Sequence, residues 1–320
     1  MNRRHTLALL MAMAVAPLAQ AEPAYPTKPI HLIVPFNPGG ASDAVGRLIG
    51  KALEEELKQP VVVENRAGGA TSIATSAVAR AQPDGYTLLM GTNLMLSNPF
   101  LYKSVSYKVE QLAPIAMLFE LPLIVNVSTK LPVKSVEELV AYAKEHPGKL
   151  NYGTTGPGTT PHMFMEQFRK MAGIDIQHIP FNGSAAILQE MIAGRIHLAF
   201  DGLPPGLAQH KAGNVRTIGA LTEERLTQLP EVPTLKELGY PIVSSTWYGI
   251  LVPAGTPPEI VDKLNTSIRK VQATDEYQQQ LANANVLPSP DYTPQEMGEF
   301  MKRNSRMWQE MIEPMNLQLD

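Results

Sequence analysis

The chain has 320 residues, with 27 lysines and arginines, 30 aspartates and glutamates and no cysteine, and a formal net charge of −3. The lack of cysteine excludes a disulfide framework, a cysteine-ligated metal and a cysteine nucleophile. The mild acidity and the lack of a basic tract exclude a nucleic-acid-binding class. The length predicts two domains, or one domain interrupted by another.

The first 21 residues have the three-part pattern of a secretory signal peptide. Arg3 and Arg4 precede an apolar segment over 7–16, and Ala19-Gln20-Ala21 is a cleavage-type triplet. The apolar part is too short to span a membrane, so we expect cleavage near Ala21 and export to a bacterial periplasm. Removing Arg3 and Arg4 leaves 25 basic and 30 acidic residues, a formal charge of −5.

A glycine turn separates the first predicted strand, over 30–34, from a predicted helix. The turn reads Pro35-Phe36-Asn37-Pro38-Gly39-Gly40-Ala41-Ser42-Asp43, and apolar residues then recur at helical spacing from Val45 to Leu57. Such a junction points backbone N–H groups and the positive end of the helix dipole into one space, which favours an anion. The alternative is that Gly39 and Gly40 only make a strand-to-helix turn.

The rest of the chain alternates short strand-like and helix-like runs, which predicts α/β layers around largely parallel sheets. Strands are expected over 61–63 and 86–90, a helix over 72–80, and irregular structure over 98–111. Two longer apolar runs, 114–127 and 245–252, flank a block that repeats the same rhythm. A chain that leaves one lobe, builds a second and returns has this pattern, and such proteins bind ligands in the cleft between the lobes.

Three more strand-to-turn-to-helix junctions are expected in the inner block. The strand over 150–153 leads into Thr154-Thr155-Gly156-Pro157-Gly158-Thr159-Thr160-Pro161-His162, and the strand over 176–179 leads into Pro180-Phe181-Asn182-Gly183-Ser184 and a helix that Gly194 ends. The strand over 196–200 leads into Asp201-Gly202-Leu203-Pro204-Pro205. Ligands of open α/β sheets gather at such strand ends. Asp201 is the only charged residue of this set, and it could hold a ligand amine or hydroxyl or only cap the next turn.

Three helix starts are predicted from capping boxes. The pairs are Ser135 with Glu138, Thr256 with Glu259, and Thr293 with Glu296, the last starting a helix through Met311. The two C-terminal helices, which begin after Thr256 and Thr293, are expected to have structural roles.

Taken together, several motifs resemble the signature blocks of one protein family. They are Pro-Phe-x-Pro-Gly-Gly-x-x-Asp over 35–43, Asn65-Arg66-x-Gly68-Gly69, Pro83-Asp84-Gly85-Tyr86-Thr87-Leu88, Gly156-x-Gly158-Thr159-x-x-His162 and Phe181-Asn182-Gly183-Ser184. In this order, over essentially the whole mature chain, they resemble the Bug family, the TctC-like substrate-binding proteins of tripartite tricarboxylate transporters.

The resemblance implies an α/β, two-lobed periplasmic binding protein of type II, a Venus flytrap in which each lobe is a mostly parallel sheet flanked by helices. The first lobe is expected to comprise 22–122 and 246–320, the second 123–245, with crossovers near 118–127 and 243–252. The function implied is capture of a small organic mono- or dicarboxylate and its delivery to the transporter's membrane permease subunits. No cofactor is expected, and the protein is expected to be a monomer.

The resemblance also implies a set of ligand-binding residues. Backbone N–H groups and hydroxyls of two turns would hold the ligand carboxylate, Phe36 would pack on the ligand body, and Asp43 would brace the first turn. The first lobe would contribute Phe36, Gly39, Gly40, Ala41, Ser42 and Asp43; the second would contribute Thr155, Gly156, Gly158, Thr159, His162, Ser184 and Asp201. Asn182 replaces a lysine found in many members, and Gly202 replaces an asparagine, so both departures bear on specificity.

Two other function classes compete with the receptor. In a hydrolase, His162 could act as the general base and Asp43 could orient it, with Ser42 or Thr159 as the nucleophile. However, no Gly-x-Ser-x-Gly elbow surrounds Ser42 or Thr159. The histidine spacings match no metal motif, so neither catalysis nor a metal site is expected. The second alternative is a ligand sensor that signals through a membrane protein. The sequence does not separate it from a transport receptor, because either a permease or a signalling protein could recognise the closed, ligand-bound form.

Overall fold

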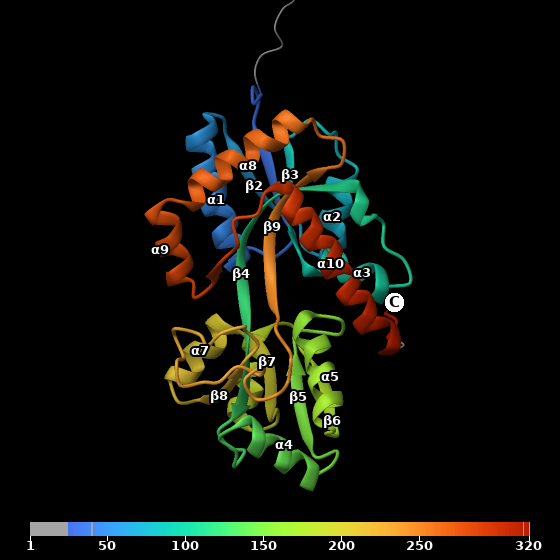
Figure 1. Ribbon diagram of the computed structural model, residues 1–320, viewed down its shortest axis with the longest axis vertical. Coiled ribbons are helices and arrows are strands. Elements are labelled where there is room, and N and C mark those ends of the chain that lie inside the picture. Colours follow the sequence, from blue (N-terminus) through green and yellow to red (C-terminus); the bar gives the residue numbers. More distant parts are fainter. Residues whose placement is uncertain (1–24, 40, 316, 320) are drawn as a thin grey trace, which may run out of the picture.

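The computed structural model describes residues 25–39, 41–315 and 317–319. The predicted signal peptide, its cleavage site near Ala21 and Gly40 lie outside the described residues. Two α/β lobes are stacked along the long axis of the molecule, and strand β4 (Leu112–Ser128) runs through both of them (Figure 1). The two-lobed α/β fold expected from the sequence is confirmed.

The first lobe is built on strands that pair in parallel. β1 (Ile30–Val34) lies between β2 (Val61–Asn65) and β3 (Thr87–Thr92), parallel to both. All of β1 except His31 is buried, as expected for a strand covered on both faces. The helices of this lobe are α1 (Ala41–Leu57), α2 (Ser72–Ala79), α3 (Asn93–Leu101), α8 (Pro258–Gln272), α9 (Asp275–Asn283) and α10 (Pro294–Ile312), with short 3-10 turns at Gly69–Thr71, Val109–Gln111 and Glu313–Met315.

The second lobe repeats the arrangement. β5 (Leu150–Thr154) lies between β6 (Ile176–Pro180) and β7 (Leu198–Gly202), parallel to both. β7 and β8 (Val215–Ala220) pair antiparallel with the second half of β4. The helices are α4 (Val136–Glu145), α5 (Thr160–Ala172), α6 (Ser184–Ala193) and α7 (Leu203–Lys211).

The lobes are joined by strands that run in opposite directions. β9 (Ser245–Pro253) pairs antiparallel with β4 between Leu112 and Pro122, and the strand order is β2-β1-β3-β9-β4-β7-β5-β6. Because the chain leaves the first lobe along β4 and returns along β9, these two strands must be antiparallel. Each lobe therefore combines a parallel set with antiparallel strands at the junction. The predicted lobe boundaries stay predictions.

The region over 98–111 is less irregular than expected, because α3 continues through Pro99 to Leu101. A proline in a helix leaves a carbonyl one turn earlier without its N–H partner. That carbonyl belongs to Met95, and the Tyr107 hydroxyl donates to it at 2.9 Å. A distant side chain thus supplies the missing donor, which the local sequence pattern does not reveal.

The three predicted capping boxes have different outcomes. Thr293 and Glu296 form the complete reciprocal box. Ser135 accepts from the Glu138 N–H, but the Glu138 carboxylate accepts from the N–H of Lys134 rather than of Ser135. The Thr256 box is wrong, since Thr256 donates to the Pro253 carbonyl at 2.8 Å and α8 begins after Pro257. The rigid φ of the prolines starts that helix instead.

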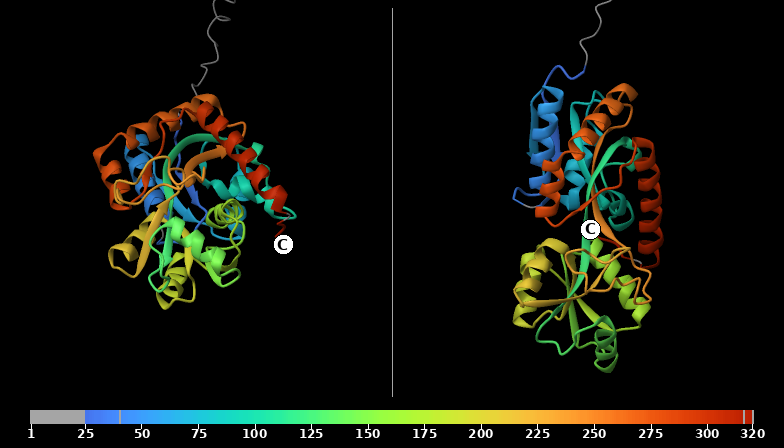
Figure 2. Two further views of the ribbon diagram at one scale, coloured as in Figure 1. Left: turned by 60° about the horizontal axis from the view of Figure 1, so that its bottom comes forward. Right: turned by 60° about the vertical axis from the view of Figure 1, so that its left-hand side comes forward.

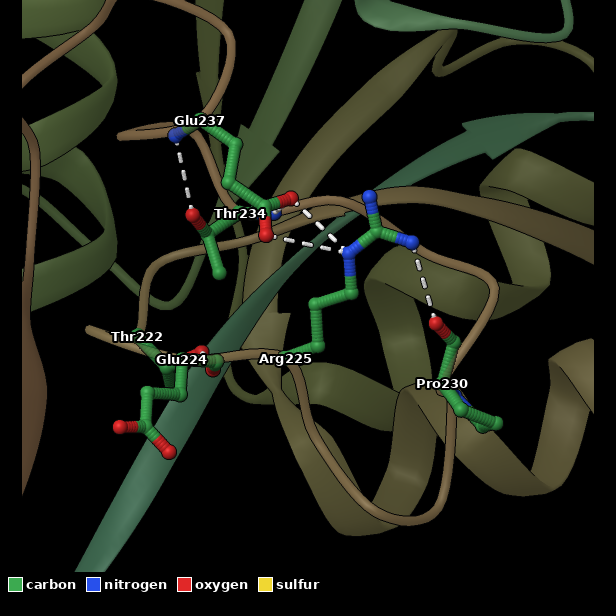
Figure 3. A network of polar contacts seen from close by, with 6 residues as sticks. All are labelled: Thr222, Glu224, Arg225, Pro230, Thr234 and Glu237. Atoms are coloured by element: carbon green, nitrogen blue, oxygen red, sulfur yellow. Dashed lines mark hydrogen bonds and ion pairs between the residues drawn. The ribbon is translucent and has the colours of Figure 1, made fainter.

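The long connection from β8 back to β9 is held by one arginine. Arg225 Nε donates to Glu237 Oε2 at 2.9 Å, and its Nη1 donates to the Pro230 carbonyl at 3.2 Å (Figure 3). The Glu237 N–H donates to Thr234 Oγ1 at 3.1 Å, closing the network. These contacts give an irregular segment a fixed course toward the junction of the lobes.

The C-terminal segment lies beside that junction (Figure 2). Leu319 forms an isolated parallel bridge with Tyr102, its N–H donating to the Leu101 carbonyl at 2.7 Å. Gly158 of the second lobe abuts the side chains of Leu101 and Leu319, because a Cβ at Gly158 would lie 2.6 Å from Leu101 Cδ1 and 3.3 Å from Leu319 Cδ1. The two lobes are therefore in close contact at Gly158.

None of the helices in the described part of the chain is both long enough and apolar enough to cross a membrane.

Candidate functional site

A cavity of about 350 Å³ lies between the lobes, where their strands end and their helices begin. It is lined by Phe36, Ser42, Thr92, Leu94, Leu121, Leu123, Thr155, Thr159, Thr160, Pro161, Ser184, Asp201, Gly202, Pro204, Pro205, Thr246 and Tyr248. Three larger cavities, of about 720, 560 and 500 Å³, lie elsewhere, but no residue of the four predicted strand-to-helix turns lines any of them. The interlobe cavity is therefore the candidate site.

Four helices begin at this cavity. Ser42 is in the first turn of α1, Thr160 begins α5, Ser184 begins α6 and Pro204 is in the first turn of α7. The first turn of a helix carries N–H groups without helical partners and a partial positive charge. Asp201 is the only charged residue among the described residues that line the cavity. An anion would thus meet dipoles here rather than lysine or arginine.

The first turn is braced by Asp43, which is 5% exposed. Its Oδ2 accepts from the Gly39 N–H at 2.9 Å and its Oδ1 accepts from Asn65 Nδ2, also at 2.9 Å. The Gly39 N–H and then Asn65 hold the pKa of Asp43 below its usual value. Asn65 Nδ2 also donates to the Phe36 carbonyl at 3.1 Å, so one network fixes both ends of the turn.

Aromatic rings form one wall of the cavity. The centroid of Phe36 lies 5.9 Å from that of Tyr248, and Tyr248 stacks on Phe119 at 4.5 Å. Tyr248 comes from β9, far from Phe36 in the sequence but beside it at the junction. This wall gives the apolar part of a ligand a rigid surface.

The second turn is held by its own hydrogen bonds. The Gly158 N–H donates to His162 Nδ1 at 3.0 Å, and the Gly156 N–H donates to Thr154 Oγ1 at 3.3 Å. Thr159 Oγ1 donates to the Gly156 carbonyl at 2.7 Å. These two glycine N–H groups are engaged within the turn. The residues of the turn that line the cavity are Thr155, Thr159, Thr160 and Pro161.

Two stacked histidines support this turn from behind. The rings of His162 and His178 lie 4.1 Å apart, and His178 Nε2 is 2.6 Å from Thr154 Oγ1. Burial, reinforced by the neighbouring His178, lowers the pKa of His162 to about 4, and burial also lowers the pKa of His178. Both rings are therefore neutral at pH 7, which leaves His162 Nδ1 able to accept from Gly158.

Asp201 is at the end of β7 and is 1% exposed. Its Oδ1 accepts from Ser184 Oγ and, at 2.9 Å, from the Gly202 N–H. Its Oδ2 has no hydrogen-bond partner among the described residues. Burial raises the pKa of Asp201 to about 6.

The family model described as the tripartite tricarboxylate transporter family receptor matches residues 45–317. The chain belongs to this family. Protein BugT of Bordetella pertussis is 35% identical over 306 residues, covering 92% of this chain and 93% of the relative. A UPF0065 protein of the same organism is 36% identical over 290 residues, covering 90% and 88%.

Solved structures of similar proteins have the same fold. An R. palustris protein with adipate has 33% identity and a TM-score of 0.80, covering 90% of this chain and 97% of that one. MatC from Rhodopseudomonas palustris, with bound malate, has 27% identity and a TM-score of 0.78, covering 90% and 100%. The periplasmic binding protein BugD has 27% identity and a TM-score of 0.79, covering 92% and 100%. These likenesses confirm the fold class of a periplasmic binding protein and the resemblance drawn from the motifs.

The predicted site residues of this family member divide into two groups in space. Six line the cavity: Phe36, Ser42, Thr155, Thr159, Ser184 and Asp201. Gly39, Asp43, Gly156, Gly158 and His162 lie in or behind the two turns and hydrogen-bond within them, and Asp43 also accepts from Asn65. Ala41 is the first residue of α1, and Gly40 lies outside the described residues. Asn182, one of the noted departures, is exposed and does not line the cavity.

Sequence reasoning missed several cavity residues. Thr92 ends β3 without a glycine turn to signal it, and Thr246 and Tyr248 come from the returning strand β9. Asn65 stands out in the sequence only as part of a family motif, yet it ties Phe36 to Asp43. Its position at the end of β2 was the available signal, because the carboxyl ends of parallel strands face the ligand.

Acid should destabilise the family member through His162. Unfolded histidine titrates near 6.5, whereas the folded pKa is about 4, so the unfolded chain binds the proton more tightly. Stability from this residue is fully present above pH 6.5 and is lost as the pH falls toward 4, by about 2–3 kcal/mol. Denaturant unfolding measures the free energy of unfolding of the wild type and of His162→Gln. The difference between the two free energies should narrow as the pH falls from 6.5 to 4. A constant difference would contradict the assignment.

Proposed function

We propose that this protein is a periplasmic solute-binding receptor that captures a small organic mono- or dicarboxylate between its lobes. The observation that carries the proposal is the convergence of four helix N-termini on one interlobe cavity whose described lining contains no lysine or arginine. Neutral N–H and hydroxyl donors in a closed, low-dielectric cleft bind anions strongly, and they allow release when the cleft opens. The adipate and malate bound to two similar proteins support carboxylates as the ligand class.

The proposed ligand contacts are the cavity-lining residues of the two lobes. Phe36 and Tyr248 would cover the apolar part of the ligand, while Ser42 and Thr155 would meet its carboxylate. Thr159 would join them once its hydroxyl turns away from the Gly156 carbonyl. The proposed boundaries place 22–122 and 246–320 in the first lobe and 123–245 in the second. Closing the lobes would bring both sets of donors onto one ligand.

The proposed delivery partner is the pair of membrane permease subunits of a tripartite tricarboxylate-type transporter. The family description supports this partner, and the pattern of residues 1–21 supports export with cleavage near Ala21. A ligand sensor for a membrane signalling protein is the alternative. Uptake of labelled ligand by cells lacking the gene separates them, because a transport receptor is required for uptake and a sensor is required only for induction.

A thermal-shift screen tests the ligand class. A ligand that binds only the native state at a hundredfold excess over its Kd raises apparent stability by about 2.7 kcal/mol. We expect one or more small carboxylates to raise the melting temperature, and sugars and cations to leave it unchanged. The bound acid should be recovered unaltered after incubation with the protein. A shift by sugars alone, or turnover of the acid, would contradict the proposal.

A further inference from the structure

Six buried side-chain polar atoms lack a hydrogen-bond partner among the described residues, and two belong to residues that line the interlobe cavity. These two are Asp201 Oδ2, from the second lobe, and Thr92 Oγ1, from the first. Both residues are 1% exposed. A buried polar atom without a partner is unfavourable, and more so when it is charged. Such a cost is recovered when a ligand supplies the missing partner.

Capping of the next turn uses only one of the two oxygens of the Asp201 carboxylate. Oδ1 accepts from the Gly202 N–H and from Ser184 Oγ, and these bonds fix the plane of the carboxylate. Oδ2 is left free of those contacts in a residue that lines the cavity. A carboxylate oxygen only accepts hydrogen bonds while it is ionised, so its partner in the cavity must be a donor.

A plain dicarboxylate would be a poor partner for this oxygen. Asp201 is the only charged residue in the described lining, and a second ligand carboxylate beside it would bring two like charges together. A hydroxyl or an ammonium group would instead donate to Oδ2. Sites built to pair with a ligand donor discriminate strongly against the analogue that lacks it, because the buried acceptor then stays unpaired.

We propose that Asp201 makes this receptor selective for organic acids that carry a hydroxyl or ammonium group in addition to the carboxylate held by the helix N-termini. Oδ2 is the acceptor for that group, and Thr92 Oγ1, which can both donate and accept, is a second polar contact from the opposite lobe. The inference rests on the proposed carboxylate receptor function and narrows its ligand class.

The test compares three four-carbon acids that differ at one position. Succinate, malate and aspartate carry hydrogen, hydroxyl and ammonium at the second carbon, and calorimetry measures their Kd values. We expect malate or aspartate to bind at least tenfold more tightly than succinate at pH 7.5. Asp201→Asn keeps the shape and the Oδ1 contacts but places an N–H donor at the Oδ2 position, so the preference should fall to less than twofold.

A control variant and a pH series complete the experiment. Thr71→Val removes another buried unpaired hydroxyl, one outside the cavity, and should leave the preference unchanged. Lowering the pH from 7.5 to 5 protonates Asp201, whose pKa is about 6, and should raise the Kd of the preferred acid. Succinate should lose less affinity than the preferred acid, because protonation removes the like charge beside its second carboxylate. A preference that is the same at pH 5 and pH 7.5 would overturn the proposal.

The two proposals fail in different ways. If succinate binds as tightly as malate and aspartate, or if Asp201→Asn keeps the preference, the selectivity proposal is wrong while the carboxylate receptor stands. If none of these acids binds and a broader panel of carboxylates gives no thermal shift, the carboxylate receptor itself is wrong.

Discussion

Asp43→Ala should lower the affinity for the ligand by at least a hundredfold and destabilise the protein by about 2–3 kcal/mol. The substitution removes the acceptor of the Gly39 N–H and of Asn65 Nδ2, at 2.9 Å each. Without Asp43 the turn loses the contacts that place Phe36 and the start of α1 at the cavity. Calorimetry of ligand binding and urea unfolding measure the two effects.

The same helix supplies a matched control. Asp43 pairs with Arg47 one turn later, and Glu55 pairs in the same i,i+4 register with Lys51, at 4.0 Å on the exposed surface. Exposed pairs of this kind contribute about 0–1 kcal/mol, so Glu55→Ala should leave affinity and stability nearly unchanged. If Asp43→Ala and Glu55→Ala change affinity and stability equally, Asp43 acts only as a surface charge. That result would contradict its role as the brace of the first turn.

Gly158→Ala should weaken ligand binding by about tenfold through the contact between the lobes. Its φ of +75° already disfavours alanine, and the added Cβ would lie 2.6 Å from Leu101 Cδ1 of the first lobe. The lobes would have to separate or Leu101 would have to move. Since the apparent affinity of a receptor scales with its population of the binding-competent state, disfavouring closure weakens every ligand alike.

A substitution at Gly173 distinguishes the effect of the contact between the lobes from the effect of backbone strain. It follows the last residue of α5, has a φ of +63°, and an added Cβ would meet no atom within 4 Å. Gly173→Ala should therefore cost comparable stability without changing affinity. Adding Leu101→Ala to Gly158→Ala should restore part of the affinity by making room. If Gly158→Ala and Gly173→Ala bind ligand equally well, closure does not involve this contact.

The strand-to-helix junctions were predictable from the sequence because their signals are local. An apolar strand, a glycine turn and a helical repeat follow one another near Gly39, Gly158 and Ser184, and the ends of all these elements meet at one cavity. The family motifs added the two-lobed arrangement, which local signals alone could only suggest through the apolar runs that became β4 and β9.

What the sequence could not predict depends on distant side chains. The N–H groups of Gly39 and Gly158 were expected to be free for a ligand, but Asp43 and His162 accept from them. Whether a side chain turns back onto its own turn depends on packing, such as the stacking of His162 on His178 from another strand. Tyr248 reaches the cavity only because β9 returns beside β4, a pairing over a long stretch of chain.

The passage of the chain through β4 and back through β9 also sets the order in which the lobes can fold. Strands β5 to β8 come from one continuous stretch, so the second lobe can form from nearby segments. The first lobe needs contacts across about 150 residues, such as Asn265 Nδ2 to the Ile115 carbonyl and Asn93 Nδ2 to the Ser245 carbonyl. Such long-range contacts form slowly because a long loop must close first. We therefore expect the first lobe to be completed last.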